Sequence, residues 1–397
     1  MKFKFAEKMY SLQPSGIRKV NEKALALERA GEKVIHFEIG RPDFDTPAYI
    51  KDACARSLAN GDVFYTSSYG DMGLRKSIAS YINRRFGLDY TGENVIVTAG
   101  LAEAIFDTLS IMLEPDDEVL VPDPIWANYL NIIKLLSAKC VSYNLLEEND
   151  YQPNLDEIKA KITPKTKILI INTPNNPTGS MLDEATMKGL AQIAVDNDLI
   201  VMSDEVYERL TYDKQKHICM ATLPGMKERT IVLNGFSKTY SMTGWRLGYA
   251  VAPEEVIGML NKFHMHAVTC ANSFSQKAAI IALDEDEKHG AVEEMVVEYR
   301  RRRDYAVKAI NAIPGISCAC PTGAFYIFIN IKALNMKSAD VAAYLLDHQH
   351  IALVPGDVFG LTGEGYIRMS FANSYENIVD GCKLLAQGIG ELMAKKS

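Results

Sequence analysis

Long apolar runs and an excess of positive charge are both missing from this sequence. No apolar stretch approaches the roughly 20 residues that a membrane-spanning helix needs, so no membrane segment is expected. The 43 Lys and Arg against 50 Asp and Glu give a net charge of −7, which argues against nucleic-acid binding. The one marked basic run, residues 300–303, is predicted to be a solvated or interface face of a helix. Because residues 1–5 lack a signal-like apolar core, a cytoplasmic location is expected.

Cysteine is scarce, and so are repeated or low-complexity segments. Seven cysteines are an odd number for a chain of 397 residues, and they show no repeated metal-ligand spacing. Reduced thiols are therefore expected, and no metal site is predicted, either there or at His264 and His266. The length and the 48% hydrophobic content allow a large core divided between two domains.

Three short aliphatic runs are each followed by a polar cluster. Residues 168–171 precede the segment Asn172-Thr173-Pro174-Asn175-Asn176, residues 199–202 precede Ser203-Asp204-Glu205-Val206-Tyr207, and residues 231–233 precede Phe236-Ser237-Lys238. Continuous aliphatic runs are typical of strands buried on both faces in parallel sheets, where ligands bind at the carboxyl ends of the strands. The pattern predicts that the polar side chains at these three strand ends, Asn176, Asp204, Tyr207 and Lys238, share one crevice.

Lys238 is the most informative of these residues. A lysine at the end of a buried strand is desolvated, and its amine can act as a nucleophile that forms a Schiff base with a carbonyl cofactor. Most lysines in loops are solvated, so Lys238 by itself would not indicate a site. Asn176 and Asp204 are also residue types that commonly form turns or cap helices. The combination at three strand ends favours a functional site.

With these motifs the chain resembles the pyridoxal-phosphate enzymes of fold type I, specifically the class I and II aminotransferases related to bacterial aspartate aminotransferase. The matching segments run from Gly40-Arg41-Pro42-Asp43 to Arg368-Met369-Ser370-Phe371, in the family's order and approximate spacing. The resemblance implies an α/β fold with a mainly parallel seven-stranded sheet flanked by helices in a large domain at 48–284. Residues 1–47 and 285–397 would form a smaller α/β domain. Strand-like runs at 95–97, 118–121, 168–171, 199–202, 231–233 and 247–251 agree with an α/β fold.

The resemblance also implies roles around pyridoxal 5′-phosphate. Lys238 would hold the cofactor as a Schiff base and transfer the substrate's α-proton, and Asp204 would keep the pyridine nitrogen protonated. Asn176 and Tyr207 would hydrogen-bond the phenolic oxygen. Trp126 would stack on the ring, although a core-filling role is an alternative for this residue.

For the phosphate, the family uses backbone amides at a helix N-terminus, which match Leu101 and Ala102, together with the guanidinium of Arg246. Tyr65 resembles a tyrosine that reaches the phosphate of the neighbouring subunit, which implies a homodimer. Relatives often have a serine three residues before the lysine, where this chain has Gly235, and a phosphate contact by Ser237 stays open.

Arg368 and the backbone of Gly40 would bind the substrate's α-carboxylate, with Trp126 and Asn176 beside it, which implies a 2-amino acid substrate. The amino group would pass to a 2-oxo acid, either 2-oxoglutarate or pyruvate, in a ping-pong reaction of amino acid metabolism. Aspartate-specific relatives often have a lysine where this chain has Ala102. The absence of this lysine favours apolar or aromatic amino acids as donors, or a broad range of donors that includes alanine and glutamate.

Two alternatives remain at this stage. A C–S β-lyase or an aminocyclopropanecarboxylate synthase-like enzyme would share the cofactor residues, because a fold does not fix a function. A cofactor-binding regulatory protein without turnover is less favoured, because the substrate arginine is present as well.

Overall fold

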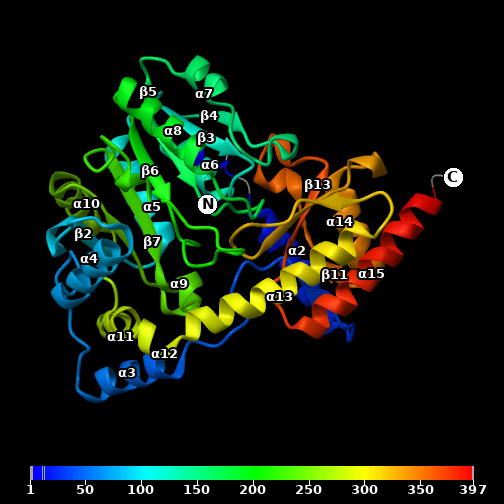
Figure 1. The fold of residues 1–397 in the computed structure, drawn as a ribbon, viewed down its shortest axis with the longest axis horizontal. Helices are drawn as coiled ribbons and strands as arrows, with labels where there is room; N and C mark the ends of the chain where they lie inside the picture. The colour runs from blue at the N-terminus through cyan, green and yellow to red at the C-terminus, as the bar shows by residue number, and fades with distance from the viewer. Residues whose placement is uncertain (1–2, 11, 13, 396–397) are drawn as a thin grey trace.

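A seven-stranded sheet forms the centre of the larger part of the molecule (Figure 1). The computed structural model describes residues 3–10, 12 and 14–395. In spatial order the strands are β2 (Val95–Thr98), β8 (Gly248–Val251), β7 (Thr230–Gly235), β6 (Ile200–Asp204), β5 (Thr166–Asn172), β3 (Glu118–Asp123) and β4 (Lys139–Asn144). Only β8 runs antiparallel to its neighbours within this sheet, so the predicted α/β fold with a mainly parallel seven-stranded sheet is confirmed.

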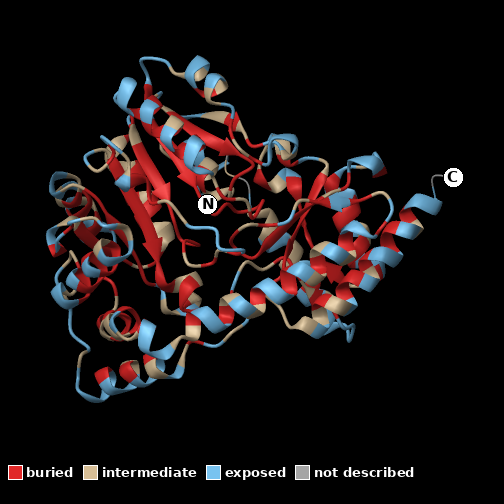
Figure 2. Cartoon of the chain, in the orientation of Figure 1, coloured by how far each residue is buried: buried red, intermediate tan, exposed pale blue. Residues whose placement is uncertain are grey.

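Helices cover both faces of this sheet because side chains alternate between the faces along each strand. On one face, Ile168 and Ile170 of β5 pack with α5 (Leu101–Met112), α6 (Asn128–Leu135) and α10 (Glu254–Ala267). On the other face, Leu169 and Ile171 pack with α8 (Glu184–Asp196). The same face carries further helices, which are α4 (Met72–Phe86), α7 (Leu155–Lys161) and α11 (Ser273–Asp284). The strands are accordingly the most continuously buried part of the chain (Figure 2).

A smaller antiparallel sheet lies on the other side of the molecule, with strand order β12-β13-β10-β9. Its strands are β9 (Ser317–Cys318), β10 (Tyr326–Asn330), β12 (Val354–Pro355) and β13 (Tyr366–Ser370), accompanied by α13 (Ala291–Asn311), α14 (Ser338–Gln349) and α15 (Tyr375–Ala394). The N-terminal segment joins this part, because β1 (Ile35–His36) pairs in parallel with β11 (Ile351–Ala352). The remaining helices are α1 (Glu7–Tyr10), α2 (Gly16–Arg29), α3 (Ala48–Ala59), α9 (Phe236–Thr239) and α12 (Asp286–His289).

Two residues of the basic run on α13 differ from expectation. Arg302 and Arg303 are only 6% and 2% exposed, so the prediction of a solvated or interface face is wrong for this half of the run. Arg302 donates to Asp43 at 2.8 Å, and Arg303 donates to Asp213 at 2.6 Å. Four consecutive residues point in all directions around a helix, so some of them must face inward, where carboxylates pair with them.

Two other expectations concern the whole chain. None of the helices in the described parts of the chain is both long and apolar enough to cross a membrane. All seven cysteines lie in the described parts, and none of them is paired in a disulfide there. Of the predicted N-terminal and C-terminal segments, residues 1–2, 11, 13 and 396–397 lie outside the described residues.

Candidate active site

A cavity of about 520 Å³ opens at the carboxyl ends of β5, β6 and β7. It collects all of the predicted site residues except Tyr65, namely Gly40, Leu101, Ala102, Trp126, Asn176, Asp204, Tyr207, Lys238, Arg246 and Arg368. Ser237 also lines it, as do further residues that were not predicted for the site, among them Ile17, Arg18, Asn128, Thr243 and Tyr326. The expectation that the three strand ends share one crevice is therefore confirmed.

Lys238 lies on the one-turn helix α9, directly after β7. Its Nζ donates a hydrogen bond of 2.5 Å to the backbone oxygen of Gly40. Burial, reinforced by the positive charge of Arg368, lowers the pKa of Lys238 to about 8, although Asp204 acts in the opposite direction. About one tenth of this amine is thus neutral at pH 7, far more than of an exposed lysine, and the neutral form is the one that a nucleophile requires.

Asp204 is the last residue of β6, and its side chain is 4% exposed. Burial raises its pKa to about 6, while the hydroxyl of Tyr129 and the amide of Val206 donate hydrogen bonds that favour the charged form. The Tyr129 hydroxyl lies 2.5 Å from Oδ2. A cation placed beside Asp204 would be strongly stabilised, because the site is buried and each carboxylate oxygen is already oriented by one hydrogen bond.

Arg368 is fully enclosed on β13, at 1% exposure. Its Nη1 donates to Oδ1 of Asn176 at 3.0 Å, and its Nη2 donates to the backbone oxygen of Glu38 at 2.5 Å. Its Nε has no hydrogen-bond partner among the described residues, and the guanidinium carbon lies 4.5 Å from the ring centroid of Tyr326. Both hydrogen bonds of this buried guanidinium go to neutral oxygens, so its positive charge is available for an anionic ligand.

A tyrosine pair joins the two sheets at this cavity. The hydroxyls of Tyr207 and Tyr326 lie 2.8 Å apart, and both side chains are buried. Gly40 must lack a side chain here, because a Cβ on it would lie 2.3 Å from the Tyr326 hydroxyl. Tyr326 and Tyr129 were not predicted as site residues. Tyr326 stands in an apolar strand and Tyr129 in an amphipathic helix, and in both settings a buried tyrosine is indistinguishable from a core residue in sequence.

The turn from β2 into α5 forms the anionic-ligand end of the cavity. Gly100 caps the helix with φ 96° and no side-chain hydrogen bond, so the amides of Leu101 and Ala102 begin the helix. Arg246 donates to the backbone oxygen of Ala99 at 3.5 Å and to that of Thr243 at 3.1 Å. The first amides of a helix have no partner within the helix, and together with a guanidinium they suit a phosphate group.

Trp126 and Tyr65 have different positions relative to this cavity. Trp126 is partly exposed at the wall and meets the ring of Tyr129 edge-on, at a centroid distance of 6.1 Å and an interplanar angle of 85°. Tyr65 is 87% exposed and does not line the cavity. Its predicted contact with a neighbouring subunit stays a prediction.

Comparisons with known proteins find relatives over nearly the whole chain. An aspartate aminotransferase of Pyrococcus horikoshii is 40% identical over 98% of both chains, and an aromatic-amino-acid aminotransferase of Thermococcus litoralis is 40% identical over 94% of this chain and 95% of its own. Among solved structures, aspartate aminotransferase from Thermus thermophilus with maleate superposes with a TM-score of 0.93 at 34% identity, covering 98% of this chain and 100% of that chain. Since the family profile for aminotransferase class I and II also matches residues 32–382, the chain belongs to the class I and II aminotransferases.

Proposed function

We propose that this aminotransferase depends on pyridoxal phosphate and moves an amino group from a 2-amino acid to a 2-oxo acid in two half-reactions. One observation carries the assignment. A lysine amine of lowered pKa lies in the same cavity as the buried carboxylate of Asp204 and the buried guanidinium of Arg368. These are the groups that such chemistry requires for covalent attachment, for protonation of a pyridine nitrogen and for carboxylate binding.

The donor set fits pyridoxal phosphate at each end. Leu101, Ala102 and Arg246 would hold the phosphate, and Asp204 would accept a hydrogen bond from the protonated ring nitrogen. The approach of β8 to the helix end is close, since a Cβ on Gly248 would lie 2.5 Å from the amide nitrogen of Leu101. When bound, the cofactor supplies an electron sink for negative charge at the substrate's Cα.

The chain's own residues would bind and move protons. The Nζ of Lys238 would attach the cofactor, and as a free amine it would move the proton from the substrate's Cα to C4′ of the cofactor. Asn176 and Tyr207 would hydrogen-bond the phenolic oxygen, and Trp126 would lie against the ring. The side chain of Asn176 would then have two partners, the phenolic oxygen and Arg368, because its Oδ1 already accepts a hydrogen bond from Arg368.

Arg368 would bind the substrate's α-carboxylate, with the backbone of Gly40 as a second contact. The unpartnered Nε supports this role, because a buried donor without a partner costs on the order of 1–3 kcal/mol that a carboxylate would recover. The proposed acceptor is 2-oxoglutarate or pyruvate.

The donor range is proposed to be broad, or to favour apolar and aromatic amino acids over aspartate, because Ala102 offers no positive charge to a distal carboxylate. Relatives are named for aspartate, for aromatic amino acids and, in a Pyrococcus furiosus structure, for alanine, so their names do not select one donor. The lyase alternative is not favoured, since these relatives are aminotransferases.

The assembly is proposed to be a homodimer in which Tyr65 of each subunit reaches the phosphate held by the other. The proposed large domain spans residues 48–284, and residues 1–47 with 285–397 form the small domain. A cytoplasmic location stays a prediction.

The first experiment is an absorption titration of the purified protein with pyridoxal phosphate, followed by single amino acids without an acceptor. We expect a visible band from lysine-bound cofactor, its loss when a suitable amino acid donates its amino group, and its return when a 2-oxo acid is added. Lys238→Ala should show no such band, whereas the exposed control Lys216→Ala should behave as the native protein. Absence of the band in the native protein would refute the proposal, and release of pyruvate and ammonia without an acceptor would identify a lyase.

A further inference from the structure

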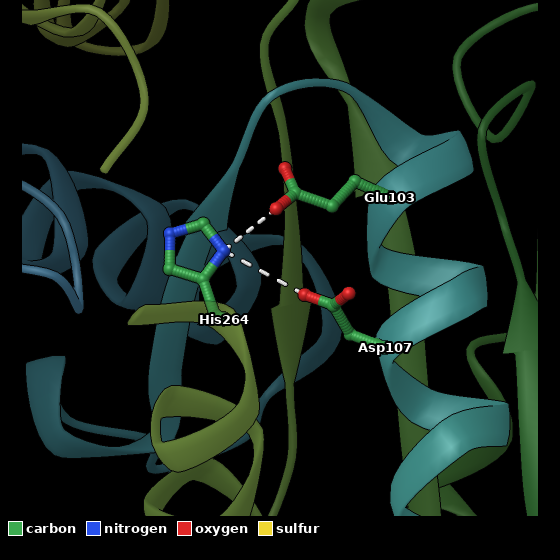
Figure 3. Close-up of side chains that lie close together, drawn as sticks. All are labelled: Glu103, Asp107 and His264. Atoms are coloured by element: carbon green, nitrogen blue, oxygen red, sulfur yellow. Dashed lines mark hydrogen bonds and ion pairs between the residues drawn. The ribbon is translucent and has the colours of Figure 1, made fainter. Parts of the chain in front are cut away.

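A buried cluster of three titratable side chains lies next to the phosphate-binding turn, outside the cavity itself. Glu103 and Asp107 are on α5, four residues apart and hence on one face of the helix, and His264 is in the last turn of α10 (Figure 3). Nδ1 of His264 lies 2.8 Å from Oε1 of Glu103 and 3.6 Å from Oδ2 of Asp107. The side chains of Glu103, Asp107 and His264 are 12%, 1% and 0% exposed, and we refer to them as the acid–histidine brace.

The brace is connected directly to the backbone of the turn. Oε2 of Glu103, the carboxylate oxygen that does not face His264, accepts a hydrogen bond from the amide of Ala99. The carbonyl of the same residue, Ala99, accepts from Arg246. Glu103 and Arg246 therefore hold the two sides of the residue that precedes Gly100, where the helix is capped without any side chain.

A carboxylate so close to an anion-binding helix end needs a counter-charge. A negative charge in the first turn stabilises a helix by itself, but it repels a phosphate bound at the same end. His264 can supply that counter-charge. Burial alone would lower the pKa of His264, but the adjacent carboxylates of Asp107 and Glu103 raise it to about 9. A histidinium at the C-terminal end of α10 is also favoured by the helix dipole.

The same three residues could also form a metal site, because their ligand atoms lie within 4.8 Å of one another, but two observations argue against it. A histidine that binds a metal normally donates its second ring nitrogen to a carbonyl or carboxylate. Nε2 of His264 is buried and has no partner within the described chain. One oxygen of Glu103 is already committed to the amide of Ala99.

We propose that the acid–histidine brace positions the phosphate-binding turn, with His264 orienting Glu103 so that Glu103 holds Ala99 and presents the amides of Leu101 and Ala102 to the phosphate. These three are positioning residues, because none of them lines the cavity. The inference rests on the proposed function, since it concerns the phosphate of pyridoxal phosphate.

Comparison of pyridoxal phosphate with pyridoxal, which lacks the phosphate, tests the proposal. In absorption titrations of the full-length apo-protein, Glu103→Ala should raise the Kd for pyridoxal phosphate about tenfold, as expected for loss of one charge-assisted hydrogen bond. The Kd for pyridoxal should stay within about twofold, because the attachment at Lys238 does not involve the turn. Equal weakening of both ligands in a Glu103→Ala protein that still folds would overturn the proposal.

Substitutions at His264 give a second, independent test should Glu103→Ala fail to fold. His264→Asn keeps a donor near the position of Nδ1 but lacks the positive charge, so it should weaken pyridoxal phosphate less than His264→Leu, which lacks both. Neither variant should change the Kd for pyridoxal by more than about twofold. The control Glu184→Ala removes an exposed first-turn glutamate from α8 and should change neither Kd. An unchanged ratio of the two Kd values in His264→Leu would refute the proposed role of the acid–histidine brace. Failure of the native protein to bind either ligand would instead overturn the proposed function itself.

Discussion

The reactivity of Lys238 depends on a balance of charges around one buried amine. Burial and the guanidinium of Arg368 lower its pKa, and the carboxylate of Asp204 raises it, with a result of about 8. A fully exposed lysine has a pKa near 10.4, so roughly two orders of magnitude more neutral amine is present at pH 7 than on the surface. The balance is therefore measurable as a pH profile.

The rate of covalent capture of pyridoxal phosphate by apo-protein should rise about tenfold per pH unit below pH 8 and level off above it, since only the neutral amine attacks. Stopped-flow absorbance measures this rate. Asp204→Asn removes the group that raises the pKa of Lys238, so the midpoint should move to lower pH. A midpoint near pH 10.5, the ordinary lysine value, would contradict the burial argument.

Replacement of Arg368 tests carboxylate binding. Arg368→Lys offers a single ammonium in place of a planar fork and leaves Asn176 or the Glu38 carbonyl without its present donor. We expect kcat/KM for amino donors to fall about 100-fold, equivalent to roughly 3 kcal/mol, mainly through KM. Steady-state kinetics measure it, and Arg300→Lys, at an exposed position on α13, is the control. A loss confined to kcat would place Arg368 in another role.

Single residues also show where sequence patterns reach their limit. Asp204 and Lys238 were predictable because polar side chains directly follow buried strands. Tyr129 was not, because it stands inside the amphipathic helix α6, and only the packing of α6 on the sheet brings its hydroxyl to Asp204. The brace was missed for the same reason, since Glu103 and His264 are 161 residues apart and neither lies in a pattern of its own.

Among the elements, the turn between β2 and α5 depends on its close approach to β8. A Cβ on Gly248 would lie 2.5 Å from the amide nitrogen of Leu101 and 2.7 Å from the carbonyl carbon of Gly100. Both contacts are with backbone, which cannot rotate away as a side chain can. The helix end can reach its position only because β8 has no side chain at this point.

Gly248→Ala should therefore displace the start of α5, lower the free energy of unfolding by about 1–3 kcal/mol and weaken the binding of pyridoxal phosphate. The matched control is Gly258→Ala on α10, where nothing lies within 4 Å of the added Cβ. That control should be neutral or stabilise the protein by up to about 1 kcal/mol, as alanine does inside helices. Denaturant unfolding and cofactor titration measure both effects. Equal behaviour of the two variants would show that the close approach is not important.

The sequence predicted the strands that are buried on both faces and missed the partly exposed edge strand. The six apolar runs all became strands of the large sheet, because continuous aliphatic sequence is typical of strands covered on both faces. Strand β4 carries no such run and lies at the edge, where Lys139 and Cys140 are exposed, so no pattern predicted it. The strand order could not be derived either, since it depends on how the connecting helices pack.

Over the whole molecule, the N-terminal segment completes a site whose other parts come from both sheets. Pairing of β1 with β11 brings the backbone oxygen of Glu38 to Arg368 on β13 and that of Gly40 to Lys238 beyond β7. These two hydrogen bonds join residues that are 330 and 198 positions apart in the sequence. The cavity is thus formed between the two parts of the fold, which is where ligands commonly bind.

The exposed stretch at residues 63–65 points beyond the single chain. Val63, Phe64 and Tyr65 are 58%, 82% and 87% exposed, which is unusual for three consecutive large apolar or aromatic side chains unless another surface covers them. The predicted homodimer would cover them and would place Tyr65 at the phosphate of the partner subunit. Each active site would then depend on residues from both subunits.

Mixing two inactive variants tests this dependence. Tyr65→Ala lacks the proposed contact across the interface, and Lys238→Ala lacks the amine, so each homodimer should have little or no activity. A mixed dimer would contain one site with Lys238 from one subunit and Tyr65 from the other. Random exchange of subunits in a symmetric dimer should therefore restore roughly one quarter of the native activity. Transaminase assays after co-unfolding and refolding, with each variant treated alone as the control, measure the recovery. If sedimentation confirms that mixed dimers form and no activity returns, Tyr65 does not act across the interface.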